Sequence, residues 1–196
     1  MKKQTTNFLR GLVLIPFLSL GSPLSMLHSN LAFLRNDGQA PSVVSIGDAD
    51  QAKADAAQAE EAIAADRAKK IDSYFADRDM PLEGYGAKLV KAADKYNLDW
   101  RLLPAIAIKE STGGKFACGN NPFGWGSCRI KFKSIDAAID TVARNLGGGN
   151  PATEQYYKNT TTKEKLHQYN GSVVPTYTAG VLKFMDLIEQ VDLGSA

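Results

Sequence analysis

Hydrophobic residues recur at helical spacing through the second half of the chain, and no stretch alternates in the way that a pair of strands requires. Leu82, Leu89 and Ala93 begin this pattern. Five segments follow it, and each predicts a helix: 81–96, 97–111, a Ser134-capped segment carrying Ile135, Ile139, Val142 and Leu146, 161–171, and a last one lined by Val181, Met185 and Ile188. The sequence therefore predicts a mainly α-helical domain over 72–196.

Capping and stop residues set the expected ends of these helices. Asp99 is the expected N-cap of the second helix, and Gly113 is its expected stop. Pro104 lies inside that helix, where we expect it to remove one hydrogen bond and kink the second turn. Thr161 and Glu164 have the spacing of a capping box.

The chain before residue 72 has three parts of different composition. Residues 1–27 join a basic start to an apolar run over 11–20, which predicts either a cleaved signal peptide or an uncleaved membrane anchor. Residues 28–47 have no sustained periodicity and are expected to be a linker. Residues 48–71 are rich in Ala and charge, which favours a solvated helical spacer. We therefore expect export to an extracytoplasmic location.

Net charge and the cysteine and histidine counts bear on which ligands the protein can bind. A formal net charge of +2 over 196 residues gives no strong electrostatic reason to bind nucleic acid. Two cysteines and two histidines form no metal-ligand cluster, so neither a metal nor a cofactor is expected. Cys118 and Cys128 most simply form a disulfide if the protein is exported, and are two buried free thiols if it is cytosolic.

Glu110 is the residue that points to chemistry. It shares a helix face with Leu103 and Ile106, so a carboxylate extends an otherwise core-facing stripe. Partial burial and the negative end of the helix dipole both raise its pKa, as a general acid for glycosidic cleavage requires. An exposed acid at a helix end is the alternative. The turn-rich sequence "STGGKFACGNNPFGWGS" that follows favours a functional site.

Several motifs carry a resemblance to a known class of enzymes. The segment "YNLDWRLLPAIAIKES" resembles the catalytic helix of lysozyme-like peptidoglycan-cleaving enzymes such as lytic transglycosylases. The continuation through Asn121-Pro122-Phe123-Gly124 and "VPTYTAGVLKFM" is similar to the bacterial mannosyl-glycoprotein endo-β-N-acetylglucosaminidase-like autolysins. The Gly-Leu-Met-Gln signature of many lytic transglycosylases is missing, which favours the glucosaminidase-like branch. The resemblance covers about residues 82 to 190.

The resemblance implies a lysozyme-like fold and cleavage of the β-1,4-linked glycan of peptidoglycan. It makes Glu110 the proton donor and places Tyr177 in the cleft as a second catalytic residue. The expected substrate-binding residues are Ser111, Asn121, Phe123, Gly124 and Trp125. Phe123 and Trp125 would stack on sugar rings, with core packing as the alternative. Asn121 would bind acetamido groups or make the turn.

No Asp or Glu lies between Glu110 and Asp136, although most glycosidases need two carboxylates. Asp136 and Asp140 are explained as acids in a helix first turn. We therefore expect the substrate's own acetamido group or 6-hydroxyl to complete the reaction, unless Asp186 or Glu189 folds into the cleft. The alternatives are lytic transglycosylase chemistry, which leaves 1,6-anhydro-muramyl ends, and a catalytically silent wall-binding module.

The segment between Glu110 and Asp136 is basic. It carries Lys115, Arg129, Lys131 and Lys133, a sign that suits the carboxylates of peptidoglycan stem peptides. A solvated surface is the ordinary explanation.

Overall fold

The computed structural model describes residues 46–194, with side chains from residue 50 onward. This part of the chain forms seven α-helices and one π-helix and contains no strand, as the hydrophobic pattern predicts. None of its helices is long and apolar enough to span a membrane. The expected signal or anchor segment 1–27 lies outside the described residues, as does the expected linker 28–47 up to residue 45.

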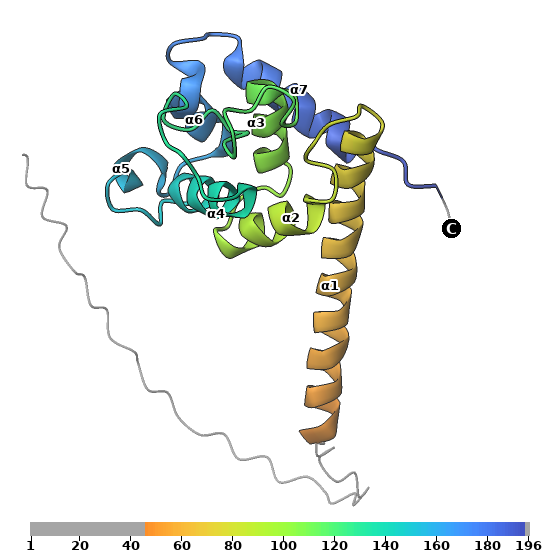
Figure 1. Cartoon of the computed structure of the whole chain (residues 1–196). Helices are drawn as coiled ribbons and strands as arrows, with labels where there is room; N and C mark the ends of the chain where they lie inside the picture. Colours follow the sequence, from red (N-terminus) through yellow and green to blue (C-terminus); the bar gives the residue numbers. More distant parts are fainter. Residues whose placement is uncertain (1–45, 195–196) are drawn as a thin grey trace, which may run out of the picture. The chain divides into compact units, whose positions relative to one another are not determined.

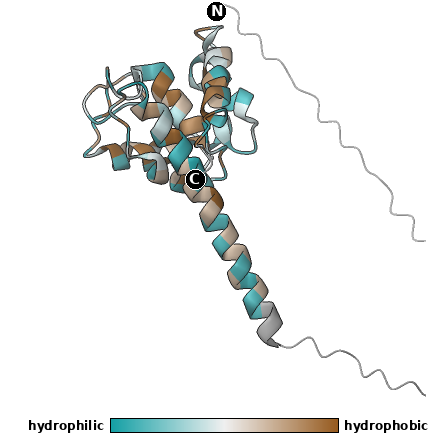
Figure 2. Ribbon diagram, turned by 90° about the vertical axis from the view of Figure 1, so that its right-hand side faces the viewer, coloured by the Kyte–Doolittle hydropathy of each residue, from teal (hydrophilic) through white to brown (hydrophobic). Residues whose placement is uncertain are grey.

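Helix α1 (Ile46–Ala76) joins the expected spacer to the domain without a break. Most side chains from 50 to 67 are exposed, whereas Ala68, Ile71 and Phe75 are buried in the core. The helix therefore passes straight through the expected boundary after residue 71, and its last two turns belong to the domain. Figures 1 and 2 show its N-terminal part outside the packed bundle.

Helix α2 (Gly86–Lys95) is shorter than the expected 81–96 because residues 81–84 form turns. Its start is tied to the end of α1. The Asp72 carboxylate accepts hydrogen bonds from the backbone N–H groups of Gly84 (2.9 Å) and Gly86 (2.8 Å). This contact ties the start of α2 to the part of α1 that enters the core.

Helix α3 (Leu102–Ser111) is the centre of the domain, and all its residues except Lys109 and Glu110 are buried. Asp99 does not cap it, because its carboxylate instead binds the N–H (3.0 Å) and guanidinium (2.6 Å) of Arg101. Pro104 is the third helical residue, where a backbone N–H has no acceptor within the helix. The expectation that Pro104 costs a hydrogen bond was therefore wrong.

The remaining helices lie between α3 and the C-terminus in the chain. Ser134 caps α4 (Ile135–Leu146) by accepting the Ala137 N–H at 3.1 Å, and Thr161 with Glu164 forms the predicted capping box of α6 (Thr162–Leu166). The short α5 (Glu154–Tyr157) precedes α6. A single helix over 161–171 was expected, but its second half is the π-helix η1 (His167–Gly171). Helix α7 (Tyr177–Glu189) packs along α3, with Val181, Met185 and Ile188 buried as predicted (Figure 1).

Candidate active site

A cavity of about 470 Å³ opens beside the C-terminal end of α3. Its walls come from four places in the chain: the end of α3, the loop that follows α3, the end of α5, and η1. The lining residues are Glu110, Gly124, Trp125, Gly126, Ser127, Tyr157, Tyr169 and Asn170. One carboxylate, three aromatic rings, two further polar side chains and two glycines therefore meet in one cavity.

Glu110 is the acid of this cavity. It lies in the last turn of α3, half-buried, at the point where the buried helix reaches the surface. Burial raises the pKa of its carboxyl group, and the Tyr177 hydroxyl and the Lys109 cation counteract part of that rise. The group is therefore more readily protonated near neutral pH than an exposed glutamate.

Gly124 brings the loop backbone directly onto this carboxylate. Its φ of +61° is in the left-handed region, and a Cβ built there would lie 2.6 Å from the Glu110 Oε2 atom. Only glycine provides both the conformation and the space. The loop and the acid are thus in contact without an intervening side chain.

Aromatic rings form a wall next to Glu110. Trp125 contacts Tyr169 at 5.4 Å and Tyr157 at 6.3 Å between ring centroids, both in tilted arrangements. Tyr169 stacks on Tyr177 at 6.0 Å and donates a 2.6 Å hydrogen bond to the Phe123 carbonyl. Burial raises the pKa of Tyr157 to about 12, so its hydroxyl stays neutral. Trp125 and Tyr169 are partly exposed, and flat rings of this kind suit the apolar face of a sugar.

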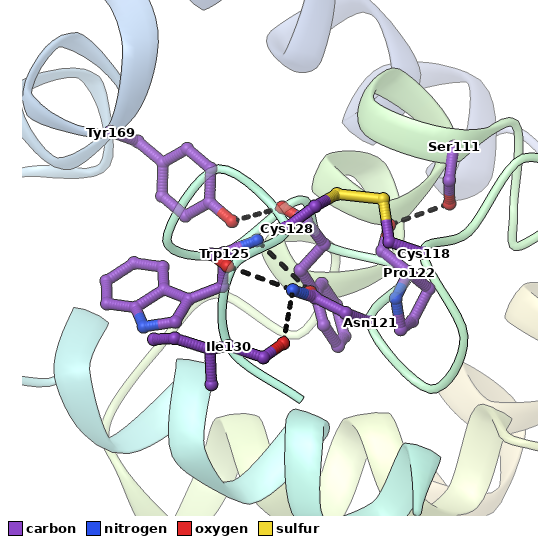
Figure 3. The surroundings of a disulfide bond; sticks show 9 residues. Ser111, Cys118, Asn121, Pro122, Trp125, Cys128, Ile130 and Tyr169 are labelled. Atoms are coloured by element: carbon purple, nitrogen blue, oxygen red, sulfur yellow. Dashed lines mark hydrogen bonds between the residues drawn. A yellow bond between two sulfur atoms is a disulfide. The ribbon is translucent and has the colours of Figure 1, made fainter. Parts of the chain in front are cut away.

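The loop between α3 and α4 is fixed by its own contacts (Figure 3). Cys118 and Cys128 form the predicted disulfide, with their Cα atoms 5.8 Å apart. The Asn121 amide accepts from the Trp125 N–H (3.1 Å) and donates to the Trp125 carbonyl (2.9 Å). Ser111 donates to the Pro122 carbonyl at 2.7 Å. These bonds set the position of Trp125 at the cavity.

The cavity brings together some of the residues expected from the sequence and not others. Glu110, Gly124 and Trp125 line it. Buried residues support the loop from behind without lining the cavity, and these are Ser111, Asn121 and Phe123. Sequence analysis missed the contributions of Gly126, Ser127, Tyr157, Tyr169 and Asn170. The Tyr-Asn-Gly run that starts at residue 169, just after a capped helix, was a usable signal for two of them.

Tyr177 lies behind Glu110 and does not line the cavity. It is 2% exposed, and its hydroxyl is buried without a hydrogen-bond partner of ordinary geometry among the described residues. The Glu110 carboxylate is nevertheless close enough to affect the Tyr177 hydroxyl, whose pKa is raised first by burial and further by neighbouring Tyr169 and Glu110. Tyr177 therefore reaches any ligand in the cavity only through Glu110 or Tyr169.

Glu110 is the one carboxylate that lines the cavity in the described part of the chain. The other acids considered from the sequence have places elsewhere: Asp136 pairs with Lys88 (2.6 Å), Asp140 with Lys95 (2.8 Å), Glu189 with Arg101 (3.1 Å), and Asp186 lines a separate hollow beside Arg101. The described residues also contain no group of three or more side chains that could hold a metal ion.

Comparison of the chain with models of protein families, with curated proteins and with solved structures finds no match. What can be said of its chemistry therefore comes from the helical fold, the disulfide-clamped loop and the cavity itself.

Proposed function

We propose that the protein cleaves the β-1,4-linked N-acetylglucosamine and N-acetylmuramic acid backbone of peptidoglycan, with Glu110 as its general acid and base. The observation that carries this proposal is a half-buried glutamate with a raised pKa in a cavity walled by Trp125, Tyr157 and Tyr169. The motifs around Glu110, with their resemblance to glucosaminidase-like autolysins, support a lysozyme-like assignment of the fold.

The chemistry that this site supports needs one protein carboxyl group. Protonated Glu110 donates its proton to the glycosidic oxygen as the bond from that oxygen to the anomeric carbon breaks. The carbonyl oxygen of the substrate's 2-acetamido group then attacks the anomeric carbon and closes an oxazolinium ring. Water opens this ring and gives its proton to the Glu110 carboxylate, which restores the acid. Among the described residues Glu110 is the one carboxylate that lines the cavity, which favours this substrate-assisted route.

Tyr177 is a positioning residue in this scheme. Its hydroxyl lies next to the Glu110 carboxylate and lowers the pKa of that group, which limits the effect of burial. Tyr169 is better placed to meet the sugar, since it lines the cavity and stacks on Tyr177. In this proposal Tyr169, and not Tyr177, lies beside the reacting sugar.

The proposed location is outside the cytoplasm, facing the cell wall. A disulfide between Cys118 and Cys128 suits an oxidising compartment. The basic and apolar start of the sequence suits export, either as a cleaved signal peptide or as a membrane anchor.

The test is mass spectrometry of purified peptidoglycan after incubation with the full-length protein and with a Glu110→Gln variant. Gln keeps the shape of the side chain and removes the acid. Glu83→Gln is the matched control, because Glu83 is exposed and does not line the cavity. Circular dichroism checks that all three proteins are folded.

New reducing N-acetylglucosamine ends from the wild type and from Glu83→Gln, but not from Glu110→Gln, are the expected result. Anhydro-muramyl ends would instead show lytic transglycosylase chemistry, in which the muramyl 6-hydroxyl attacks the anomeric carbon. Intact glycan with every folded protein would refute the enzymatic proposal and leave a wall-binding module.

A further inference from the structure

Positive charge is concentrated in the loop that carries Trp125. Residues 111–135 contain four basic side chains and no acidic one, although the whole chain has a formal charge of only +2. The rest of the molecule is therefore net negative. None of the four cations forms an ion pair with a carboxylate among the described residues. Lys88 and Lys95 on α2 and Arg101 just before α3, by contrast, all do.

Three of these cations lie at alternate positions of one short segment, and we call them the cationic strip: Arg129, Lys131 and Lys133. All three are exposed, as is Ile130 beside the first two, whereas Phe132 is half-buried and packs against the core. The fourth cation, Lys115, is engaged elsewhere, because its ammonium group donates to the Arg78 carbonyl at 2.8 Å.

The backbone of the cationic strip is held in place. The Asn120 side chain donates to the Phe132 carbonyl (3.1 Å), and the Asn121 side chain reaches the Ile130 carbonyl (3.5 Å, Figure 3). The Arg129 N–H donates to the carbonyl of Gly126, a cavity-lining residue, at 3.1 Å. The disulfide at Cys128 precedes the strip directly. The strip therefore continues the rim of the cavity as a fixed element.

We propose that the cationic strip binds the carboxylate groups of the peptide branches carried by the glycan in the cavity, and so selects peptide-bearing strands over bare glycan. This deepens the proposed function and rests on it for the location of the glycan. Unpaired, exposed cations at the rim of a site attract an oppositely charged ligand and mainly set its association rate and salt dependence. An uncharged N-acetylglucosamine oligomer has nothing for the strip to bind.

The test is a sedimentation binding assay with purified peptidoglycan, in which the full-length protein carries Glu110→Gln so that the polymer stays intact. The strip variant adds Arg129→Gln, Lys131→Gln and Lys133→Gln. The matched control adds Lys53→Gln, Lys69→Gln and Lys183→Gln, which removes the same charge from exposed lysines on α1 and α7. A second polymer has its carboxylates converted to neutral methylamides.

The strip variant is expected to bind native peptidoglycan about tenfold more weakly than its parent, since each exposed ion pair contributes roughly a 1.4- to 5-fold factor. The control is expected to bind as the parent does. The difference should disappear on the methylamide polymer and near 1 M salt, where the Debye length falls to about 3 Å.

Three results would overturn the inference. The strip and control variants could lose the same affinity for native peptidoglycan, or the strip variant could lose as much affinity for the methylamide polymer as for the native one. The third is a strip variant that binds the polymer as its parent does but no longer attaches to vesicles of anionic lipid. The last would make the strip a membrane contact. This assay does not need cleavage, so its result stays separate from the test of Glu110. A wild type that binds through the strip but cuts neither peptidoglycan nor N-acetylglucosamine oligomers refutes the enzymatic proposal alone.

Discussion

Replacing Gly124 by alanine tests whether the loop backbone positions the Glu110 carboxylate. The new Cβ would lie 2.6 Å from Glu110 Oε2, whereas ordinary contact begins at 3.4 Å, so the two groups must separate by roughly 0.8 Å. A displacement of about 1 Å of a catalytic group lowers rates on the order of 100-fold. The φ of +61° adds about 1–2 kcal/mol of destabilisation, because alanine is strained in that region.

Gly119→Ala separates these two effects. Gly119 lies in the same loop with a φ of +64°, but a Cβ there meets nothing within 4 Å. Both variants should lose about 1–2 kcal/mol of unfolding free energy in urea titrations, because the backbone strain is alike. Only Gly124→Ala should lose about 100-fold in peptidoglycan cleavage, followed by the release of soluble fragments. Equal cleavage by the two variants would refute the idea that close contact with the loop holds Glu110 in place.

The remaining predictions concern the acid and the supports of the loop. Glu110→Gln should raise the free energy of unfolding at pH 7 and leave it unchanged near pH 3, because a raised pKa means that the folded state disfavours the charged carboxylate. Urea unfolding at both pH values measures this, and equal effects at the two pH values would contradict it. Asn121→Ala should lower the free energy of unfolding by about 2–3 kcal/mol, because it leaves the backbone N–H and carbonyl of Trp125 without these partners. Asn120→Ala removes one exposed bond and should lower it by under about 1 kcal/mol. Similar unfolding free energies for the two variants would refute this. Reducing the Cys118–Cys128 disulfide, whose cysteines are 10 residues apart, should lower the free energy of unfolding by about 3 kcal/mol. Urea unfolding with and without reductant measures this, and no change would mean that other contacts hold the loop.

Local signals in the sequence predicted much of the fold. Ser134 and the Thr161–Glu164 pair each satisfy backbone groups within a few residues, so their effect on α4 and α6 is visible without tertiary structure. Asp99 failed as a predictor because Arg101, two residues away, competes for its carboxylate. The continuity of α1 across residue 71 was missed, since the composition changes there while the helix does not.

Glu110, which lines the cavity, could be singled out from the sequence because a charged residue on an apolar helix stands out. Tyr169 was missed because its place at the cavity depends on the packing of η1 against a loop more than 40 residues earlier in the chain. Ser111 and Asn121 were assigned to the substrate because polar side chains bonded to backbone look the same in a sequence as those that bind ligands. Only the folded loop shows where their hydrogen bonds go.

The C-terminal end of α1 is packed in the core and its N-terminal end is exposed, so the two ends differ in how readily they unfold. Its C-terminal turns are anchored by Ile71 and Phe75, so the costly first turn of the helix is already formed when the exposed turns are added. Amide hydrogen exchange should accordingly accelerate step by step from residue 75 back toward residue 50. The exposed stretch from 50 to 67 is about 27 Å long at 1.5 Å per residue. The helix is stiff over this length, and fraying shortens it only from its N-terminal end.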